Sequence, residues 1–167
     1  MATFVWYDNE VPENLKVKQV YGLVFSKDGR MLVRVVNKPD GRKMYCLAGG
    51  TPEPFDKDME ATLRREFIEE VNTTLQTPIY AGYQLVDEEN GKPPYAQVRM
   101  VALIDEIGPK QPDPDNGETY DRMLVHPDKV ISLLNWGKVL VDQIATATQI
   151  AKTQLGITEF VDQDEDV

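Results

Sequence analysis

The chain has 167 residues, of which 41% are apolar and 28% are charged, and its formal net charge is −10. This length predicts one domain that can bury a core without disulfides or structural metals. No run of about 18 apolar residues is present, so we expect no membrane span. The acidic charge argues against a long nucleic acid as partner, and the single cysteine, Cys46, excludes a cysteine-rich metal site.

The first half of the chain predicts strands joined by turns. Short runs rich in β-branched and aromatic residues indicate strands at residues 3–7, 17–25, 31–36 and 44–47. The turn residues 26–29 predict that the second and third of these strands form a hairpin.

A helix is expected after the loop that contains Pro52 and Pro54. Asp58 can cap its N-terminus, and Asn72 can end it in the left-handed conformation that asparagine tolerates. Between them an apolar residue recurs at every fourth position, at Met59, Leu63, Phe67 and Val71. This spacing predicts one apolar face that packs on the sheet.

The second half predicts three more strands, at residues 78–86, 95–104 and 118–125. Asn90-Gly91 indicates a hairpin between the first two, and three prolines mark residues 108–117 as an exposed loop. Two helices are expected after the last strand, one beginning at Pro127 and one over residues 135–155.

These elements predict a mixed α/β fold of the α+β type, in which helices cover a largely antiparallel or mixed sheet. We expect residues 1–160 to form a single domain and the acidic residues 161–167 to form a disordered tail. No secretory leader is recognised, and one cysteine fits a reducing compartment, so we expect a cytoplasmic protein.

Three carboxylates near the end of the first helix indicate its chemistry. Glu66, Glu69 and Glu70 are spaced i, i+3 and i+4, so they project over one face and repel one another if unpaired. A divalent cation such as Mg²⁺ or Mn²⁺, which prefers oxygen ligands, removes this conflict. Arg65 can hold the cluster by pairing with Glu69 or with a loop carboxylate such as Glu53. The simpler interpretation is a solvated acidic helix face.

The segment that begins with Gly49-Gly50-Thr51-Pro52-Glu53 and ends with Arg65-Glu66-Phe67-Ile68-Glu69-Glu70 resembles the Nudix box. The core of that pattern, R-E-U-x-E-E with U an apolar residue, is matched in full. The resemblance implies a Nudix-like mixed β-sheet sandwiched between helices.

The resemblance also implies a set of roles. Glu66, Glu69 and Glu70, with the carbonyl of Gly50, would bind the metal, and Arg65 would orient the cluster. Glu69 and Glu70 are candidates for the group that takes a proton from water. Substrate contacts are implied for Gly49, Gly50 and Glu53.

The family often supplies a further glutamate from a downstream loop. Glu118 is the best match for it, with Asp121 and Glu106 behind it, although loop glutamates are usually only surface charge.

The loop before the helix departs from the family pattern by one residue. The glutamate that orders this loop in the family falls on Asp56 or Lys57, depending on the direction of counting. Asp56 or Glu60 can substitute for it. The family glycine after the box is Asn72, and the apolar position that follows is Thr73.

Other residues are weaker candidates. His126 precedes Pro127 at a helix start, where a capping or surface role is favoured over catalysis. Cys46 lies in an apolar strand and is interpreted as a core residue. Several aromatic residues could stack on a base, although packing is the commoner role: Trp6, Tyr7, Tyr45, Tyr95 and Tyr120.

The resemblance implies a Mg²⁺-dependent hydrolase of a phosphoanhydride bond, acting on a small nucleotide. The substrate would be a nucleoside diphosphate linked to another group, for example a nucleotide sugar such as ADP-ribose, or a nucleoside triphosphate. The alternative is a catalytically weak Nudix-fold module that senses nucleotides or binds proteins. Oligomeric state stays open, and a homodimer is compatible with the sequence.

Overall fold

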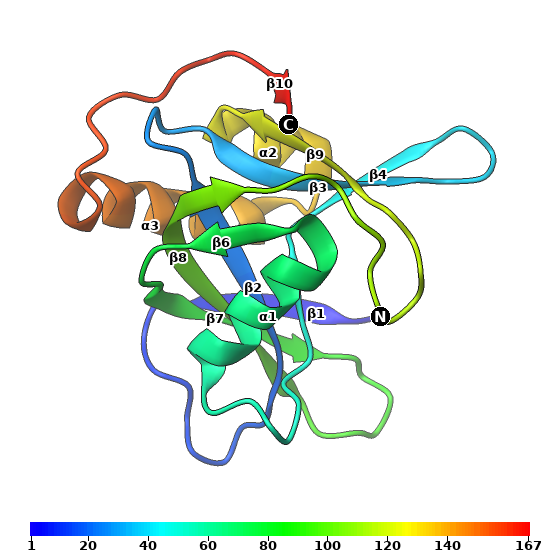
Figure 1. Ribbon diagram of the computed structural model, residues 1–167. Coiled ribbons are helices and arrows are strands. Elements are labelled where there is room, and N and C mark those ends of the chain that lie inside the picture. Colours follow the sequence, from blue (N-terminus) through cyan, green and yellow to red (C-terminus); the bar gives the residue numbers. More distant parts are fainter.

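Two long parallel strands form the centre of the structure, a computed structural model that describes all 167 residues (Figure 1). These strands are β2 (Val17–Phe25) and β8 (Tyr95–Ile107). β7 (Ile79–Asp87) pairs antiparallel with β8, and β1 (Thr3–Tyr7) pairs antiparallel with β7 and forms the edge. The parallel pair with antiparallel neighbours makes this a mixed sheet, as expected.

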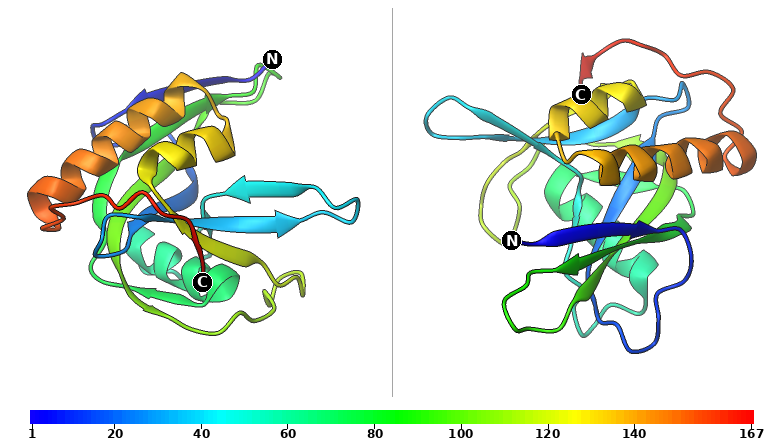
Figure 2. Two further views of the ribbon diagram at one scale, coloured as in Figure 1. Left: turned by 90° about the horizontal axis from the view of Figure 1, so that it is seen from above. Right: turned by 180° about the vertical axis from the view of Figure 1, so that it is seen from behind.

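On the other side of β2 the sheet continues through strands that diverge from it. β3 (Met31–Asn37) is joined to β2 by the expected hairpin and pairs with both β4 (Lys43–Cys46) and β9 (Asp121–Val125). β5 (Gly49–Gly50) pairs with β2, and β10 (Glu165–Asp166) pairs with β9. The β3–β4 hairpin projects from the body of the molecule in Figures 1 and 2.

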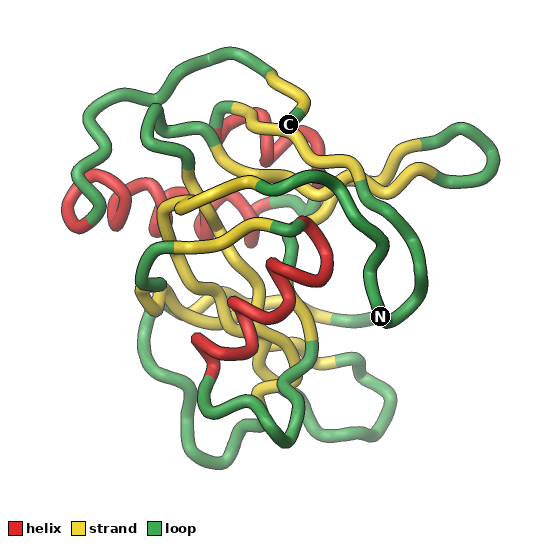
Figure 3. The backbone as a smooth tube through the Cα atoms, in the orientation of Figure 1, coloured by secondary structure: helices red, strands yellow, loops and turns green.

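Helices cover both faces of the sheet, as Figures 2 and 3 show. α1 (Met59–Val71) lies on one face, followed directly by the short strand β6 (Thr73–Leu75), which pairs with the end of β8. α2 (Pro127–Leu134) and α3 (Lys138–Gln154) lie on the other face. None of the three is long and apolar enough to cross a membrane.

The alternation of side chains along β2 divides the core into two clusters. Val20 and Val24 pack with Leu63 and Phe67 of α1, whereas Leu23 belongs to the cluster that α3 covers.

Gly22 lies beneath α1, where a methyl group would come within 2.6 Å of the Phe67 ring. The absence of a side chain there lets the helix approach the sheet closely.

The caps predicted for α1 are confirmed. The Asp58 side chain accepts a hydrogen bond from the Ala61 backbone N–H, and Asn72 ends the helix with φ 43° and ψ 51°. The helix therefore begins and ends where the sequence predicts, and the carboxylates lie in its last two turns.

Two predicted boundaries shift because of local backbone geometry. The helix expected from residue 135 begins at Lys138, because Asn135 and Gly137 both have positive φ and separate it from α2. The strand expected from residue 118 begins at Asp121, because the residues before it form a turn in which the Asp113 N–H donates to the Glu118 carbonyl. The short strands β5 and β6 were not predicted.

The tail over residues 161–167 differs from the expected disorder. It lies along β9, and β10 pairs with residues of that strand. Arg30 donates to the Gln163 carbonyl and forms an ion pair of 2.9 Å with Glu165, while Lys129 pairs with Asp164 at 3.3 Å. The acidic side chains of the tail repel one another, which is why disorder was predicted. Ion pairs with Arg30 and Lys129 and backbone pairing with the edge of β9 offset this repulsion.

Candidate functional site

The three carboxylates of α1 lie at the junction between the helix and the sheet. Glu66 and Glu70 are only 7% and 8% exposed, and Glu69 is half-buried. Burial is the largest cause that raises the pKa of each carboxyl above its ordinary value, since it disfavours the charged form. These side chains are therefore not fully solvated, whereas those of a simple acidic helix face would be.

Arg65 ties the helix to the loop before it. Its Nη1 donates to Glu66 at 3.1 Å and to Glu69 at 3.2 Å, and its Nη2 donates to the Thr51 carbonyl at 3.0 Å. Its Nε and Nη2 also contact both oxygens of Asp56, at 3.0 and 2.9 Å. The loop carboxylate that Arg65 binds is Asp56, and Glu53 lies exposed in the same loop.

Asp56 has the loop-ordering role that was expected of Asp56 or Glu60. Besides binding Arg65, it accepts hydrogen bonds from the Glu53 N–H at 2.8 Å and the Thr62 hydroxyl at 2.9 Å. Hydrogen bonding to Arg65 holds the pKa of Asp56 far below its usual range. Glu60 instead pairs with Arg64 at 3.4 Å. The loop before α1 is one residue longer than the family pattern, and Asp56 still ties it to Arg65 and Thr62 of the helix.

Glu70 faces the sheet and contacts two groups there. Its Oε1 accepts the Gly49 N–H at 2.8 Å, and its Oε2 forms an ion pair with Arg34 of β3. Burial outweighs the opposing charge of Arg34 and raises the pKa of Glu70 to about 7. Sequence reasoning missed Arg34, because an arginine within an apolar strand carries no recognised motif.

Gly50 leaves room for the Glu66 carboxylate. A methyl group built on Gly50 would collide with both oxygens of that carboxylate, so β5 and α1 can approach only at a glycine. Gly49 is also buried, with φ 145°, and a side chain there would strike the backbone of Val20. The two glycines thus let the carboxylates lie directly against the strand.

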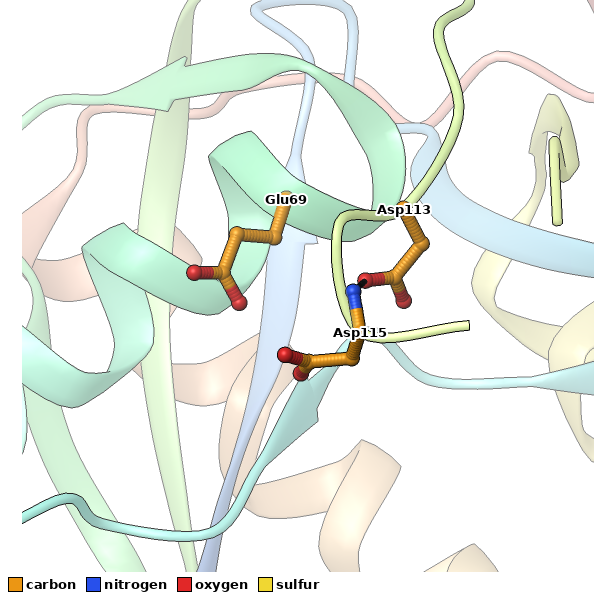
Figure 4. A group of neighbouring side chains, drawn as sticks. All are labelled: Glu69, Asp113 and Asp115. Carbon is orange, nitrogen blue, oxygen red and sulfur yellow. Dashed lines mark hydrogen bonds between the residues drawn. The ribbon is translucent and has the colours of Figure 1, made fainter. Parts of the chain in front are cut away.

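Two aspartates that sequence reasoning missed join this cluster from the loop before β9. Oxygens of Glu69, Asp113 and Asp115 all lie within 4.8 Å of one another (Figure 4). Asp113 is only 5% exposed, and its Oδ1 accepts the Asp115 N–H at 2.9 Å. The signal for them is the Asp113-Pro114-Asp115 sequence, which places two carboxylates two positions apart within the proline-rich loop.

The downstream candidates lie in other surroundings. The Glu118 side chain is exposed, and its backbone contacts Asn116 and Asp113 in the loop turn. Asp121 binds Lys110 and Asn37, each at 2.7 Å, and Glu106 is exposed on β8. The carboxylates that this loop brings beside Glu69 are therefore the aspartates.

The remaining candidates have local contacts. His126 caps α2, because its Nδ1 accepts the Asp128 N–H at 3.0 Å, as the capping interpretation predicts. Cys46 is half-buried at the end of β4, opposite Arg34 of β3. The Arg34 guanidinium lies over the ring of Tyr120, with 4.6 Å between its central carbon and the centre of the ring.

Comparisons with known proteins place this geometry in a family. The family model of the NUDIX domain matches residues 15–144. A search of curated protein sequences finds no match.

Solved structures share the fold at low sequence identity. A pyrophosphohydrolase from Bacillus subtilis is 19% identical with a TM-score of 0.66, covering 89% of this chain and 91% of that one. A NUDIX hydrolase from Nitrosomonas europaea is 13% identical with a TM-score of 0.62, covering 87% and 94%. An Ap4A hydrolase from C. elegans is 14% identical with a TM-score of 0.55, covering 81% and 98%. The match to the family model spans most of the chain and includes the whole carboxylate helix, and the chain therefore belongs to the Nudix family of hydrolases.

Proposed function

We propose that the protein hydrolyses a phosphoanhydride bond in a small nucleotide and depends on Mg²⁺, for which Mn²⁺ can substitute. The substrate is a nucleoside diphosphate linked to another group, such as a nucleotide sugar, or a nucleoside triphosphate. The observation that carries this proposal is the meeting of Glu69 of α1 with Asp113 and Asp115. The pyrophosphohydrolase and Ap4A hydrolase activities named for two structural neighbours support the reaction class.

The donor atoms at the site fit a divalent cation. Carboxylate oxygens are the ligands that Mg²⁺ and Mn²⁺ prefer, and Glu69, Asp113 and Asp115 present them within a few ångströms. We propose that Glu66, Glu69, Glu70 and the Gly50 carbonyl hold the metal, with both aspartates as further ligands. A bound cation lowers the pKa of water and neutralises charge on phosphoryl oxygens.

The chain's own residues supply orientation and the proton acceptor. Arg65 fixes the position of Glu66 and Glu69, and Arg34 with the Gly49 N–H fixes Glu70. Glu69 accepts a hydrogen bond from Arg65 through Oε2 only, so we propose that its Oε1 takes the proton from the attacking water. Glu70 is the second candidate, since both of its oxygens already accept hydrogen bonds.

Glu118 stays a proposal for the same role. Its side chain is exposed in the loop that carries Asp113 and Asp115 and is not part of the group that these aspartates form with Glu69. Substitution of Glu118 by glutamine would lower kcat without changing metal affinity if Glu118 takes the proton. Gly49 and Gly50 of β5 and Glu53 of the loop that follows are proposed to contact the substrate.

The deciding experiment is a substrate screen with Mg²⁺ or with EDTA, in which released phosphate is detected after coupling to a phosphatase. Nucleoside triphosphates, nucleotide sugars and dinucleoside polyphosphates form the panel. Hydrolysis that requires Mg²⁺ and is lost in Glu69→Gln supports the proposal. Equal rates with Mg²⁺ and EDTA would favour the alternative, a catalytically weak module that senses nucleotides or binds proteins. The cytoplasmic location and the homodimer stay predictions.

A further inference from the structure

A second site, largely apolar but with two arginines and two glutamines in its walls, lies on the face of the sheet that α3 covers. It is a pocket of about 340 Å³ whose walls include Tyr21, Arg34, Gln84, Gln97, Arg99 and Trp136. No acidic side chain lines it, although acidic residues outnumber basic ones by 28 to 18 in the chain. Because Arg34 also pairs with Glu70, the pocket adjoins the carboxylate site.

Arg99 is buried in this pocket without a carboxylate partner. It is 1% exposed, its Nε donates to Gln143 Oε1 at 2.8 Å, and its Nη1 has no hydrogen-bond partner. The rings of Tyr21 and Trp136 lie 5.0 and 6.0 Å from its guanidinium. Burial lowers its pKa to about 10, so the group is charged at neutral pH. A buried charge in this state is costly unless a ligand supplies acceptors.

Arg122 shows how a structural arginine is accommodated in the same protein. It is also buried, at 5% exposed, and its Nη1 donates to the carbonyls of Val71 and Gly108 at 2.8 and 2.7 Å. Only two buried side-chain polar atoms in the chain have no partner, Arg34 Nε and Arg99 Nη1, and both residues line the pocket. The unsatisfied donors are therefore gathered at one place.

A chain of hydrogen-bonded glutamines begins at Arg99. Arginine can only donate, so Arg99 fixes the carbonyl end of Gln143 toward itself. Three amides then each donate from Nε2 to the Oε1 of the next. Gln143 donates to Gln84 at 2.8 Å, Gln84 donates to Gln97 at 2.8 Å, and Gln97 donates to Gln19 at 3.0 Å. Two members of this chain, Gln84 and Gln97, line the pocket. The pocket is therefore lined by two arginines, which can only donate, and by no carboxylate.

We propose that this pocket binds the base of a 6-oxopurine nucleotide, with Arg99 recognising the adjacent acceptors O6 and N7. This inference rests on the proposed function and narrows its substrate class. Arginine pairs with those two acceptors of guanine, whereas adenine presents an amino group at position 6 that would face a donor. Tyr21 and Trp136 supply flat apolar surfaces. The pocket volume is near the lower end for ligand sites, about 300–1,000 Å³, which suits one base.

Binding of nucleoside monophosphates in EDTA tests the inference without requiring catalysis. Calorimetric titration with GMP, IMP, AMP and UMP should show GMP and IMP binding about 10- to 100-fold more tightly than AMP. IMP shares O6 and N7 with GMP but lacks its 2-amino group, so tight binding of IMP would show that O6 and N7 are sufficient for recognition. AMP or UMP binding as tightly as GMP would overturn the inference, even if Mg²⁺-dependent hydrolysis is found. A GMP preference without any hydrolysis would overturn the proposed function alone.

Variants of two buried arginines separate recognition from a structural role. Arg99→Met should abolish the preference for GMP over AMP while leaving the melting temperature equal or higher, because an uncompensated charge is removed. Arg122→Met, the matched control, should lower the melting temperature and keep the preference. Arg99→Lys keeps the charge but loses the planar fork, and it should also lose most of the preference. A preference retained in either Arg99 variant would overturn the inference.

Discussion

Arg65 and Arg99 differ in their partners, because carboxylates surround Arg65 and none contacts Arg99. Arg65 is in contact with Asp56, Glu66 and Glu69, and the chain itself supplies every partner. Arg99 is more deeply buried and has one amide oxygen as its only hydrogen-bond partner. The first arrangement holds acidic groups at a fixed geometry, and the second leaves donors open. We infer that charges satisfied within the chain shape a site, whereas unsatisfied ones indicate where a ligand binds.

The largest expected effect is on catalysis at the carboxylate cluster that Arg65 holds. Glu69→Gln removes a proposed metal ligand and the proposed proton acceptor while keeping the size of the side chain. We expect kcat to fall by roughly 100-fold or more. The measurement is the steady-state rate on the best substrate at saturating Mg²⁺, with Glu60→Gln on the same helix as a control that keeps its activity. A Glu69→Gln variant as active as this control would contradict the assignment.

The next effect is on stability and tests whether Arg65 is satisfied. Asp56→Asn removes the carboxylate that accepts two arginine contacts in a nearly buried setting. We expect a loss of about 3 kcal/mol in the free energy of unfolding, as for other broken buried ion pairs. Urea denaturation measures it. The control is Asp40→Asn, which breaks the exposed pair with Arg42. If the two losses were equal, Asp56 would not anchor the loop.

A smaller effect should appear in the pH dependence of metal-free protein. Burial raises the pKa of Glu70 to about 7 in the folded state, above its value of about 4.3 in an unfolded chain. The folded state therefore binds the proton more tightly, and this stabilisation is complete below about pH 4.3 and is lost as pH rises through about 7. Melting temperatures in EDTA should fall between pH 5 and 8, and Glu70→Gln should flatten that decline. An unchanged slope in the variant would show that a group other than Glu70 causes the decline.

The smallest effect concerns the end of α1, away from both arginines. Asn72 has a left-handed backbone and its Nδ2 donates to the Pro109 carbonyl at 2.9 Å. Asn72→Ala should cost about 1 kcal/mol, because alanine tolerates that conformation less well. Thermal unfolding measures the loss, and Asn72→Gly should recover part of it. Equal stability of the alanine and glycine variants would show that backbone conformation is not the source.

The sequence predicted the parts of the fold that depend on local chemistry. Asp58 and Asn72 mark the ends of α1 because caps act on neighbouring backbone groups. The strands β2 and β8 follow from β-branched runs. β6 and the tail strand β10 were missed, because their pairing depends on a strand edge brought near only by the tertiary fold.

The candidate site divides in the same way. Glu66, Glu69, Glu70 and Arg65 share one helix, so their spacing alone predicts that they lie together. Arg34 comes from β3, and Asp113 comes from a loop more than 40 positions after Glu69. No periodicity in a single sequence predicts contacts across such a separation. Asp56 was identified as one of two alternatives, and only the structure distinguishes it from Glu60.

The central claim is that the acidic groups around Glu69 bind a divalent cation, and Mn²⁺ binding followed by electron paramagnetic resonance tests it most directly. The protein should bind Mn²⁺, Mg²⁺ should compete for the site, and Glu69→Gln and Asp113→Asn should each weaken binding about 10-fold or more. Glu60→Gln should leave the binding curve unchanged. Equal Mn²⁺ affinity in all four proteins would contradict the account, since the metal would then lie elsewhere.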